Sequence, residues 1–248
     1  MHSGGGPNAV EKVCAVLRAV SAKPGARLTE LTGAAQLNKV TVARILETLC
    51  TEGFIVKTGK TYALGVEAIA MSASAARSKN LRAIARPSLQ RLAQASEDTA
   101  QLAVRSGLDS VCIDREIGTY PLRNTYLEVG SRRPLGVGAG SLALLTFLSD
   151  EEVKLILDMI EPQLADFPRL SRPVIEDMIQ VSRKRGYALS LDVILDKLGA
   201  ISVPVRDRDG RVLCSISIAA LSDRIRERET ALFEMLKVEA QLLQLELK

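Results

Sequence analysis

The chain has 248 residues, 47% of them hydrophobic and 25% charged, and its formal net charge is +4 at pH 7. This length exceeds the usual size of one domain, so we expect two. Its apolar runs fall well below the roughly 20 residues of a membrane-spanning helix, which excludes a membrane protein. Residues 1–7 are rich in glycine and lack the pattern of a secretory signal. We therefore expect a disordered arm there and a soluble, cytoplasmic protein.

Histidine and cysteine usage argues against an enzyme or a metalloprotein. The single histidine, His2, lies in the glycine-rich arm, which removes the commonest general base from any folded active site. Catalysis would need carboxylate, lysine or cysteine groups alone, and the sequence has no evident cluster of them. The four cysteines are far apart, with no CxxC pair and no neighbouring histidine to complete a zinc site. We expect no catalytic activity, no metal and no cofactor.

Positive charge is concentrated in the first quarter of the chain. Through Ala70 there are eight basic and five acidic residues, an excess of three within the net charge of +4. A local excess of basic side chains is expected where a protein contacts the phosphates of nucleic acid. The charge distribution therefore favours a nucleic-acid-binding segment at this end.

Two short helices are predicted to open this segment. Asn8 can cap the first, whose apolar side chains recur at helical spacing, and Pro24-Gly25 ends it. Thr29 is expected to cap the second, because an acidic residue and an apolar run follow it. Residues 36–38 then form a break of the length that separates the two helices of a helix-turn-helix.

Residues 39–52 are predicted to form the recognition helix of this motif. One apolar stripe consists of Val42, Ile45, Leu46 and Leu49. The side chains off this stripe near the N-terminal end are Lys39, Val40, Thr41 and Arg44. A stripe of this kind anchors a helix, while its N-terminal side chains can reach base edges and phosphates in a major groove. Gly53 is expected to end the helix.

A β-hairpin is predicted next, from strand-like runs at residues 54–56 and 61–64. Lys57 and Lys60 lie at its tip, where a wing can contact the DNA backbone. Helix-helix-hairpin modules also mediate protein interactions without DNA, and we keep this as the alternative. The order and spacing of the elements together favour DNA. The residues expected to contact it are Arg27, Thr29, Lys39, Val40, Thr41, Arg44, Lys57 and Lys60.

The rest of the chain is predicted to form a linker helix at residues 66–80 and a larger α+β domain at residues 81–248. A helix is expected at residues 81–95, interrupted or restarted near Pro87. Strands are expected at residues 99–105, 110–116, 187–191, 200–205 and 212–219, and helices at residues 141–148, 150–160, 174–185 and 225–245. This order indicates an antiparallel sheet with flanking helices. The DNA-binding domain would then comprise residues 8–65.

A turn of small residues, Gly136 to Ser141, leads directly into one of these helices. Small side chains allow backbone N–H groups to face a pocket, and the helix dipole favours an anion at this position. A carboxylate would fit. The same turn is equally compatible with a role in tight packing alone.

These segments together resemble the IclR family of transcription regulators. The N-terminal residues that carry the resemblance are Leu28–Leu31, Leu37–Leu46, Gly53–Ile55 and Tyr62–Gly65. Those of the second domain are Arg86–Ala93, Gly138–Gly140, Arg183–Tyr187, Pro204–Val212 and Ser215–Ile218. The resemblance covers essentially the chain from Val10 onward. It implies a winged helix-turn-helix that binds a double-stranded DNA operator, a GAF/PAS-like effector-binding domain, and dimers or tetramers.

The resemblance also implies where an effector would bind. The family's contacts fall on Gly138, Ala139, Ser190, Ala200, Ser217 and Ala219 of this sequence. The family often has an aspartate at Ser190, and Asp192, two residues away, is the expected substitute for that carboxylate. At two of these contact positions alanine replaces a polar group of the family. We therefore expect a small carboxylate effector with an apolar body, aromatic or branched.

The sequence departs from the family in two places. Gln36, Asn38 and Val40 stand where the family usually has glycine, proline and serine, so its base contacts cannot be carried over unchanged. Residues 135–137 replace a polar residue that is common before the glycine-containing turn. The mechanism implied by the resemblance is a population shift, in which the effector favours one arrangement of the effector domains and the linker helices change the spacing of the DNA-binding heads.

Overall fold

The computed structural model describes residues 7–77, 81–121 and 127–247. The chain forms two compact units, residues 1–80 and 81–248. We call the first the head and the second, after the role that the resemblance implies for it, the effector domain. The predicted disordered arm lies outside the described residues except for Pro7, as do the last three residues of the predicted linker helix. None of the described helices is long and apolar enough to span a membrane.

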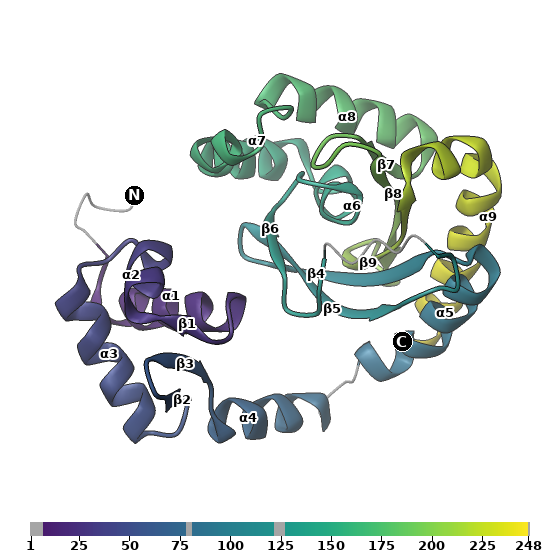
Figure 1. Cartoon of the computed structure of the whole chain (residues 1–248). Coiled ribbons are helices and arrows are strands. Elements are labelled where there is room, and N and C mark those ends of the chain that lie inside the picture. The colour runs from purple at the N-terminus through teal and green to yellow at the C-terminus, as the bar shows by residue number, and fades with distance from the viewer. Residues whose placement is uncertain (1–6, 78–80, 122–126, 248) are drawn as a thin grey trace. The chain divides into compact units, whose positions relative to one another are not determined.

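The head consists of three helices, a three-stranded sheet and a further helix (Figure 1). In chain order the elements are α1 (Ala9–Ala22), β1 (Ala26–Arg27), α2 (Leu28–Ala35), α3 (Lys39–Thr51), β2 (Ile55–Thr58), β3 (Thr61–Leu64) and α4 (Val66–Arg77). The sheet is antiparallel with the order β1-β3-β2. Val16, Leu31 and Leu46 are almost fully buried and join α1, α2 and α3 in one core. The predicted helix-turn-helix and wing are both present.

Helix starts in the head follow their capping groups, with one correction to the prediction. Asn8 caps α1 as predicted, and its side chain accepts a hydrogen bond from the backbone N–H of Glu11. Thr29 does not cap α2, so that prediction is wrong. The N-cap is Arg27 and the helix begins at Leu28, two residues before the start that a Thr29 cap implies, because the Glu30 carboxylate reaches back to accept the backbone N–H of Arg27, at 2.8 Å. This is the acidic half of a capping box without its hydroxyl partner.

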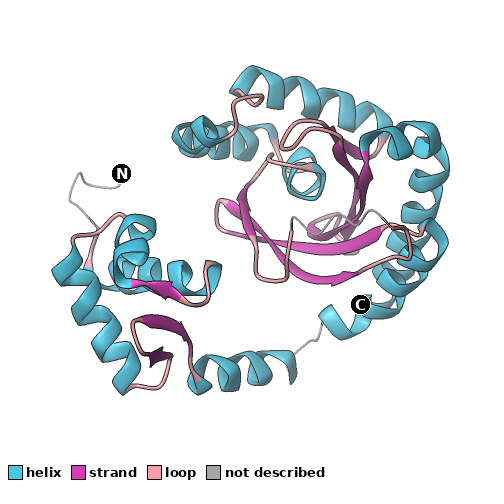
Figure 2. Ribbon diagram, viewed as in Figure 1, coloured by secondary structure: helices cyan, strands magenta, loops and turns pink. Residues whose placement is uncertain are grey.

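The effector domain is an α+β unit, as predicted, built on a six-stranded antiparallel sheet (Figure 2). Its strands are β4 (Thr99–Ser106), β5 (Asp109–Glu116), β6 (Arg132–Pro134), β7 (Ala188–Leu191), β8 (Leu198–Arg206) and β9 (Val212–Leu221). Their order in the sheet is β6-β5-β4-β9-β8-β7. The helices are α5 (Leu81–Ser96), α6 (Ala139–Thr146), α7 (Asp150–Ile160), η1 (Glu161–Asp166), α8 (Arg172–Arg185) and α9 (Ser222–Glu246).

Two apolar cores lie on the two faces of this sheet. On one face α5 and α9 pack through residues such as Leu89 and Leu236. On the other face α6, α7 and α8 pack through residues such as Leu144, Leu157 and Ile175. The sheet curls around α6 (Figure 2), and that helix is buried on nearly all sides. Helix α6 is therefore held rigidly at the centre of the domain.

Several elements differ from the prediction, and η1 is among those that were not predicted. Helix α5 continues through Pro87 without a restart, because Arg86 pairs with Asp114 on one side of the proline and Leu89 is buried in the core on the other. Strands β1 and β6 were not predicted. Each has only two or three residues, too few for an alternating pattern to emerge.

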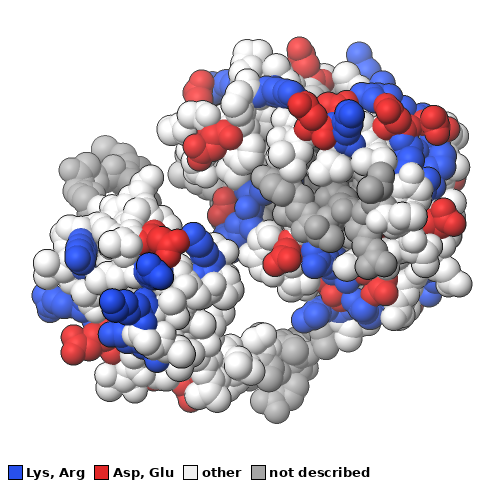
Figure 3. Space-filling view, viewed as in Figure 1, with Lys and Arg blue, Asp and Glu red and all other residues white. Residues whose placement is uncertain are grey.

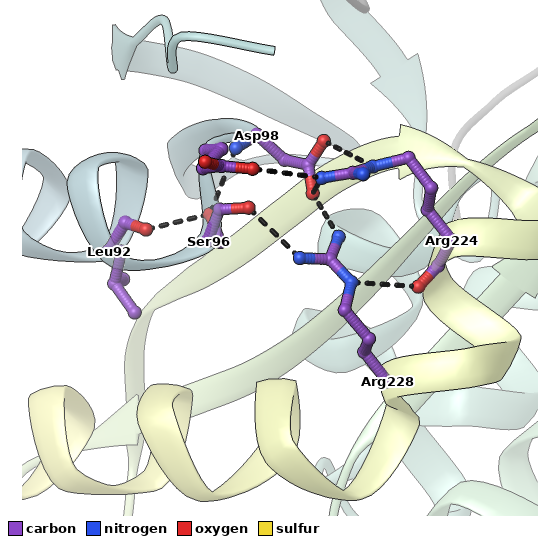
Figure 4. A network of polar contacts seen from close by, with 6 residues as sticks. Leu92, Ser96, Asp98, Arg224 and Arg228 are labelled. Atoms are coloured by element: carbon purple, nitrogen blue, oxygen red, sulfur yellow. Dashed lines mark hydrogen bonds and ion pairs between the residues drawn. The ribbon is translucent and has the colours of Figure 1, made fainter.

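A buried carboxylate connects α9 to the end of α5 (Figure 4). The side chain of Asp98 is 2% exposed and forms ion pairs with Arg224 and Arg228. Arg228 also donates to the backbone carbonyl of Ser96, at 3.0 Å, and lies at a kink in α9 where its φ is −120°. Moving a charged side chain out of water costs free energy unless partners of opposite charge compensate it. This network therefore fixes the direction in which α9 leaves the sheet.

Candidate nucleic-acid interface and ligand pocket

Helix α3 presents the predicted division between an anchoring face and an exposed face. Val42 and Leu46 are buried in the core of the head. Lys39, Val40 and Arg44 are exposed near the N-terminal end, and Val40 is 71% exposed although it is apolar. The Asn38 side chain accepts the backbone N–H of Thr41, at 2.8 Å, so the first turn of α3 is capped from within the chain. The exposed side chains therefore extend from a fixed helix start.

The remaining predicted DNA-contacting residues are also on the surface of the head. Arg27 is exposed on β1 and Thr29 is exposed in the first turn of α2. Lys57 and Lys60 are exposed on the β2–β3 hairpin, and the Lys57 ammonium lies 5.7 Å from the centre of the Tyr62 ring. Figure 3 shows several basic side chains on the visible face of the smaller unit, with few acidic ones among them.

None of these basic side chains forms an ion pair with a described carboxylate of the head. Among its described residues, Lys23 and Glu30 form the one ion pair. Two residues of this surface were not predicted. Lys12 of α1 and Thr48 of α3 line a cleft with Thr41 and Arg44, with a volume of about 470 Å³. Sequence reasoning missed them because the contact between α1 and α3 is tertiary.

The effector domain contains a pocket at the start of α6. Its volume is about 70 Å³, and it is enclosed by β4, β7, β8 and β9 together with the turn before α6. Five residues on these strands that line it are Gln101, Ser190, Ala200, Ser217 and Ala219. Sheet register explains their proximity, because Ser190 pairs with Ala200, Ala200 with Ala219, and Gln101 with Ser217. The six family-implied contacts, which include Gly138 and Ala139, all line this pocket.

The backbone at the start of α6 faces this pocket without a side-chain cap. Gly138 is the N-cap, with φ of 87°, and no side chain of the described residues accepts the first N–H groups of the helix. A side chain at Gly138 would lie 3.0 Å from the Arg133 guanidinium and 3.1 Å from Ile194. Glycine is therefore required both for this backbone conformation and for the close approach of Arg133. Ser141 donates to the Pro134 carbonyl, at 2.7 Å, and fixes the turn.

Arg133 gives the pocket a positive charge that sequence reasoning missed. It lies on the three-residue strand β6, paired with Ser110 of β5, and both line the pocket. A short polar run gives no strand signal, so nothing in the pattern indicated that Arg133 turns inward. An arginine beside an uncapped helix N-terminus is a suitable environment for a small anion, because charge and backbone donors act together.

Asp192 does not line this pocket. It follows the end of β7 in a left-handed conformation, with φ of 60°. Its carboxylate accepts hydrogen bonds from the Ser222 hydroxyl, at 2.7 Å, and the Lys197 backbone, and it pairs with Arg226. The Ser222 hydrogen bond, followed by Arg226, lowers the pKa of Asp192. Asp192 thus holds the turn between β7 and β8 to the start of α9.

Comparison with known protein families gives two matches that together span both units. Residues 9–59 match the IclR helix-turn-helix domain, and residues 73–244 match the bacterial transcriptional regulator IclR C-terminal domain. The curated relatives include HTH-type transcriptional regulator KipR of Bacillus subtilis, 28% identical over 88% of both chains. They also include transcriptional repressor IclR of Escherichia coli, 29% identical over 86% of this chain and 79% of its own. These relatives are named as regulators or repressors, not as enzymes.

Solved structures share the fold over almost the whole chain. An IclR transcriptional regulator from Alicyclobacillus acidocaldarius superposes with a TM-score of 0.77 at 22% identity, covering 95% of this chain and 97% of its own. An IclR homologue from Microbacterium hydrocarbonoxydans, solved in complex with 4-hydroxybenzoate, gives a TM-score of 0.76 at 20% identity. The matched regions cover 97% of this chain and 99% of that one.

Proposed function

Because this chain belongs to the IclR family of transcriptional regulators, we propose that the pocket at the start of α6 binds a small carboxylate that alters DNA binding by the head. The chain has the family's helix-turn-helix DNA-binding domain and its C-terminal effector domain. The family match thus supplies the general activity. We propose in addition the chemical class of the effector and that its binding alters the affinity of the head for DNA.

The observation that carries the proposal is the combination of Arg133 with the uncapped first turn of α6. Both line one pocket, and Arg133 lies 3.0 Å from the position that a side chain at Gly138 would occupy. A carboxylate there can accept hydrogen bonds from the guanidinium and from backbone N–H groups at once, as charge-assisted bonds. Ser190 and Ser217 offer hydroxyl groups from the strands that line the same pocket.

The rest of the pocket wall favours an effector with an apolar body. Ala103, Val137, Ile194 and Leu195 line it together with the alanines at positions 139, 200 and 219. Its volume of about 70 Å³ is smaller than the roughly 150 Å³ cavity that holds benzene in another protein, so a branched aliphatic acid fits more readily than a ring. An aromatic acid requires Ile194 and Leu195 to move outward. The 4-hydroxybenzoate complex of the Microbacterium homologue supports the carboxylate class.

For the head, we propose DNA contacts by Arg27, Thr29, Lys39, Val40, Thr41, Arg44, Lys57 and Lys60. Basic side chains without carboxylate partners are free to replace the counterions of DNA phosphates. One recognition helix reads too few base pairs for useful specificity, so we also propose a dimer or a tetramer. Val66, Ile69 and Met71 on α4 are 60% to 68% exposed and offer an apolar surface for pairing with the same helix of a second copy.

Fluorescence anisotropy of the full chain on the DNA upstream of its own gene tests both parts of the proposal. We expect tight, sequence-selective binding that weakens steeply between 50 and 200 mM salt, roughly a thousandfold or more for six or more phosphate contacts. Isovalerate or benzoate is expected to change this affinity. Weak, indiscriminate binding with or without these acids would favour the protein-interaction alternative.

A pair of matched variants tests the effector site itself. Arg133→Gln is expected to weaken the response to isovalerate at least tenfold, since a charge-assisted interaction contributes about 1.5–3 kcal/mol. Arg132→Gln is the control, because Arg132 is the neighbouring residue on β6 and pairs with Asp109. Equal responses in the two variants would refute the role of Arg133. A response to glyoxylate alone would refute the apolar effector.

A further inference from the structure

A second groove in the effector domain lies at the free end of β8. It has a volume of about 300 Å³ and lies between α9 on one side and the C-terminal ends of α6 and α8 on the other. The residues that define it are Phe147, Gly186, Pro204, Arg206, Phe233 and Lys237. None of its lining residues belongs to the pocket at the start of α6.

The groove exists because the edge strand of the sheet is short. Strand β7 pairs with β8 only from Gly199 to Ser202. Strand β8 continues to Arg206, still paired with β9 on its other side, so its last residues form an open sheet edge. Pro204 occupies this edge, and a proline cannot donate a hydrogen bond to an added strand. The edge therefore suits a small ligand better than a peptide in β conformation.

Two cations on aromatic rings line this groove. The Arg206 guanidinium lies 4.5 Å from the centre of the Phe147 ring, and the Lys237 ammonium lies 5.7 Å from that of Phe233. Arg206 forms no ion pair with any described residue, and Lys237 has one exposed partner, Glu234, at 3.4 Å. An exposed pair of this kind contributes little. Both cations therefore keep most of their capacity for an external anion.

The helix ends beside the groove do not require these cations. Arg183 donates to the backbone carbonyls of Thr146 and Leu148, at 2.8 and 3.1 Å, and so satisfies the C-terminal end of α6. At the end of α8, the Gly186 N–H donates to the Ser182 carbonyl. Neither Arg206 nor Lys237 is therefore needed to satisfy the C-terminal ends of α6 and α8.

From this arrangement we propose that the groove is a second ligand site, for an aromatic monocarboxylate, separate from the effector pocket. The carboxylate binds Arg206 and Lys237, and the ring packs against Phe233 and Pro204. The volume is about four times that of the pocket at α6 and accommodates a bicyclic ring. The groove borders α9, whose direction is fixed by Asp98, so an occupant contacts the helix that closes one face of the domain.

Binding of 2-naphthoate to the full chain, measured by the fluorescence of the probe, tests this site. Arg206→Gln/Lys237→Gln is expected to weaken binding at least tenfold, because both charge-assisted contacts are lost. The matched control is Arg208→Gln/Lys154→Gln, which removes the same two charge types at exposed positions outside the groove. Arg133→Gln is expected to leave this binding in place, which separates the second site from the proposed effector pocket.

A neutral analogue tests the charge requirement without any variant. The wild-type chain is expected to bind 2-naphthamide at least tenfold more weakly than 2-naphthoate. The proposal is overturned if the double variant binds 2-naphthoate like the wild type, if the control pair loses as much affinity, or if the acid and the amide bind equally. Loss of binding in Arg133→Gln would assign the probe to the effector pocket and equally overturn it.

Discussion

The two units of this chain use basic side chains in different ways. In the effector domain, arginines are mostly paired: Arg224 and Arg228 with Asp98, Arg86 with Asp114, and Arg91 with Glu239. In the head, Lys23 is the one described basic residue with a carboxylate partner. The first arrangement stabilises a fold, while the second leaves charge available for a polyanion. The net charges of the two units, +5 for residues 1–80 and −1 for residues 81–248, do not by themselves show this difference in pairing.

The same contrast applies to the carboxylates that these arginines hold. Asp98 and Asp114 have side chains that are 2% exposed, so they depend on their arginines for compensation of charge. Glu30 in the head is paired with Lys23, whose hydrogen bond lowers its pKa, but the pair is on the surface. Ion pairs therefore contribute to the stability of the effector domain and add little to the stability of the head. The following variants test this division, from the largest expected effect to the smallest.

Gly65→Ala is expected to unfold the head and leave the effector domain folded. A methyl group at this position would lie 2.2 Å from the Gly53 carbonyl oxygen and 3.1 Å from the Ile55 nitrogen, both backbone atoms that cannot rotate away. The expected cost exceeds about 4 kcal/mol, comparable with the whole stability of a small domain. Circular dichroism melting and DNA binding measure the result.

Gly33→Ala is the matched control in the same unit. No atom lies within 4 Å of the added methyl group, and the residue is helical. We expect a stabilisation of about 0.5–1 kcal/mol and unchanged DNA binding. If Gly65→Ala melts and binds DNA like Gly33→Ala, the close packing of Gly65, between β3 and α4, against the residues at the start of β2 is wrong.

Asp98→Asn is expected to destabilise the effector domain by about 3 kcal/mol, because two arginines lose a buried partner. For a domain of this size the melting temperature should fall by roughly 6–12 °C, measured by calorimetry. Asp196→Asn is the control, since the Asp196 pair with Arg169 is exposed on both sides. A shift of the head transition, or equal effects of the two variants, would contradict the division between the units.

Arg44→Ala is expected to weaken operator binding by about 1–3 kcal/mol, or roughly fivefold to 150-fold, if the side chain reads a base. Arg44 is exposed on α3 and beyond its anchoring face, so folding should not change. Arg18→Ala, at an exposed position on α1, is the control. Anisotropy titrations with operator and random DNA distinguish base reading from phosphate contact, since only the former reduces selectivity.

Helical periodicity and turn residues predicted most helices and strands. They did not predict the shortest strands or the conformation of the turn that follows β7. The anchoring face of α3 followed from Val42 and Leu46, since one buried stripe repeats over several turns. Strand β6 has three residues and no pattern, so the position of Arg133 depended on pairing with β5, which is 20 or more residues away in sequence. The sequence around β6 does not indicate that it pairs with β5.

The spacing of two residues between Ser190 and Asp192 does not place both side chains at the pocket. Alternation along a strand places residues i and i+2 on the same face, which would have aligned Asp192 with Ser190. Strand β7 ends at Leu191, however, and Asp192 takes up a left-handed conformation that directs its carboxylate to Ser222 and Arg226. The positions of Ser190 and Ala200 follow from the pairing of β7 with β8, and both residues line the pocket.

Lys60→Gln gives the smallest expected effect and the sharpest test of what an unpaired cation does. Lys60 is exposed at the tip of the β2–β3 hairpin and has no carboxylate partner among the described residues, whereas Lys23 is paired with Glu30. Removing one phosphate contact lowers the slope of log affinity against log salt by about 1. Between 50 and 200 mM salt, the ratio of wild-type to Lys60→Gln affinity should therefore shrink by roughly threefold. Lys23→Gln should leave the slope unchanged, because its charge is already balanced within the head. Equal slopes for all three proteins would show that the hairpin does not touch the DNA backbone, and that an unpaired lysine alone does not mark a phosphate contact.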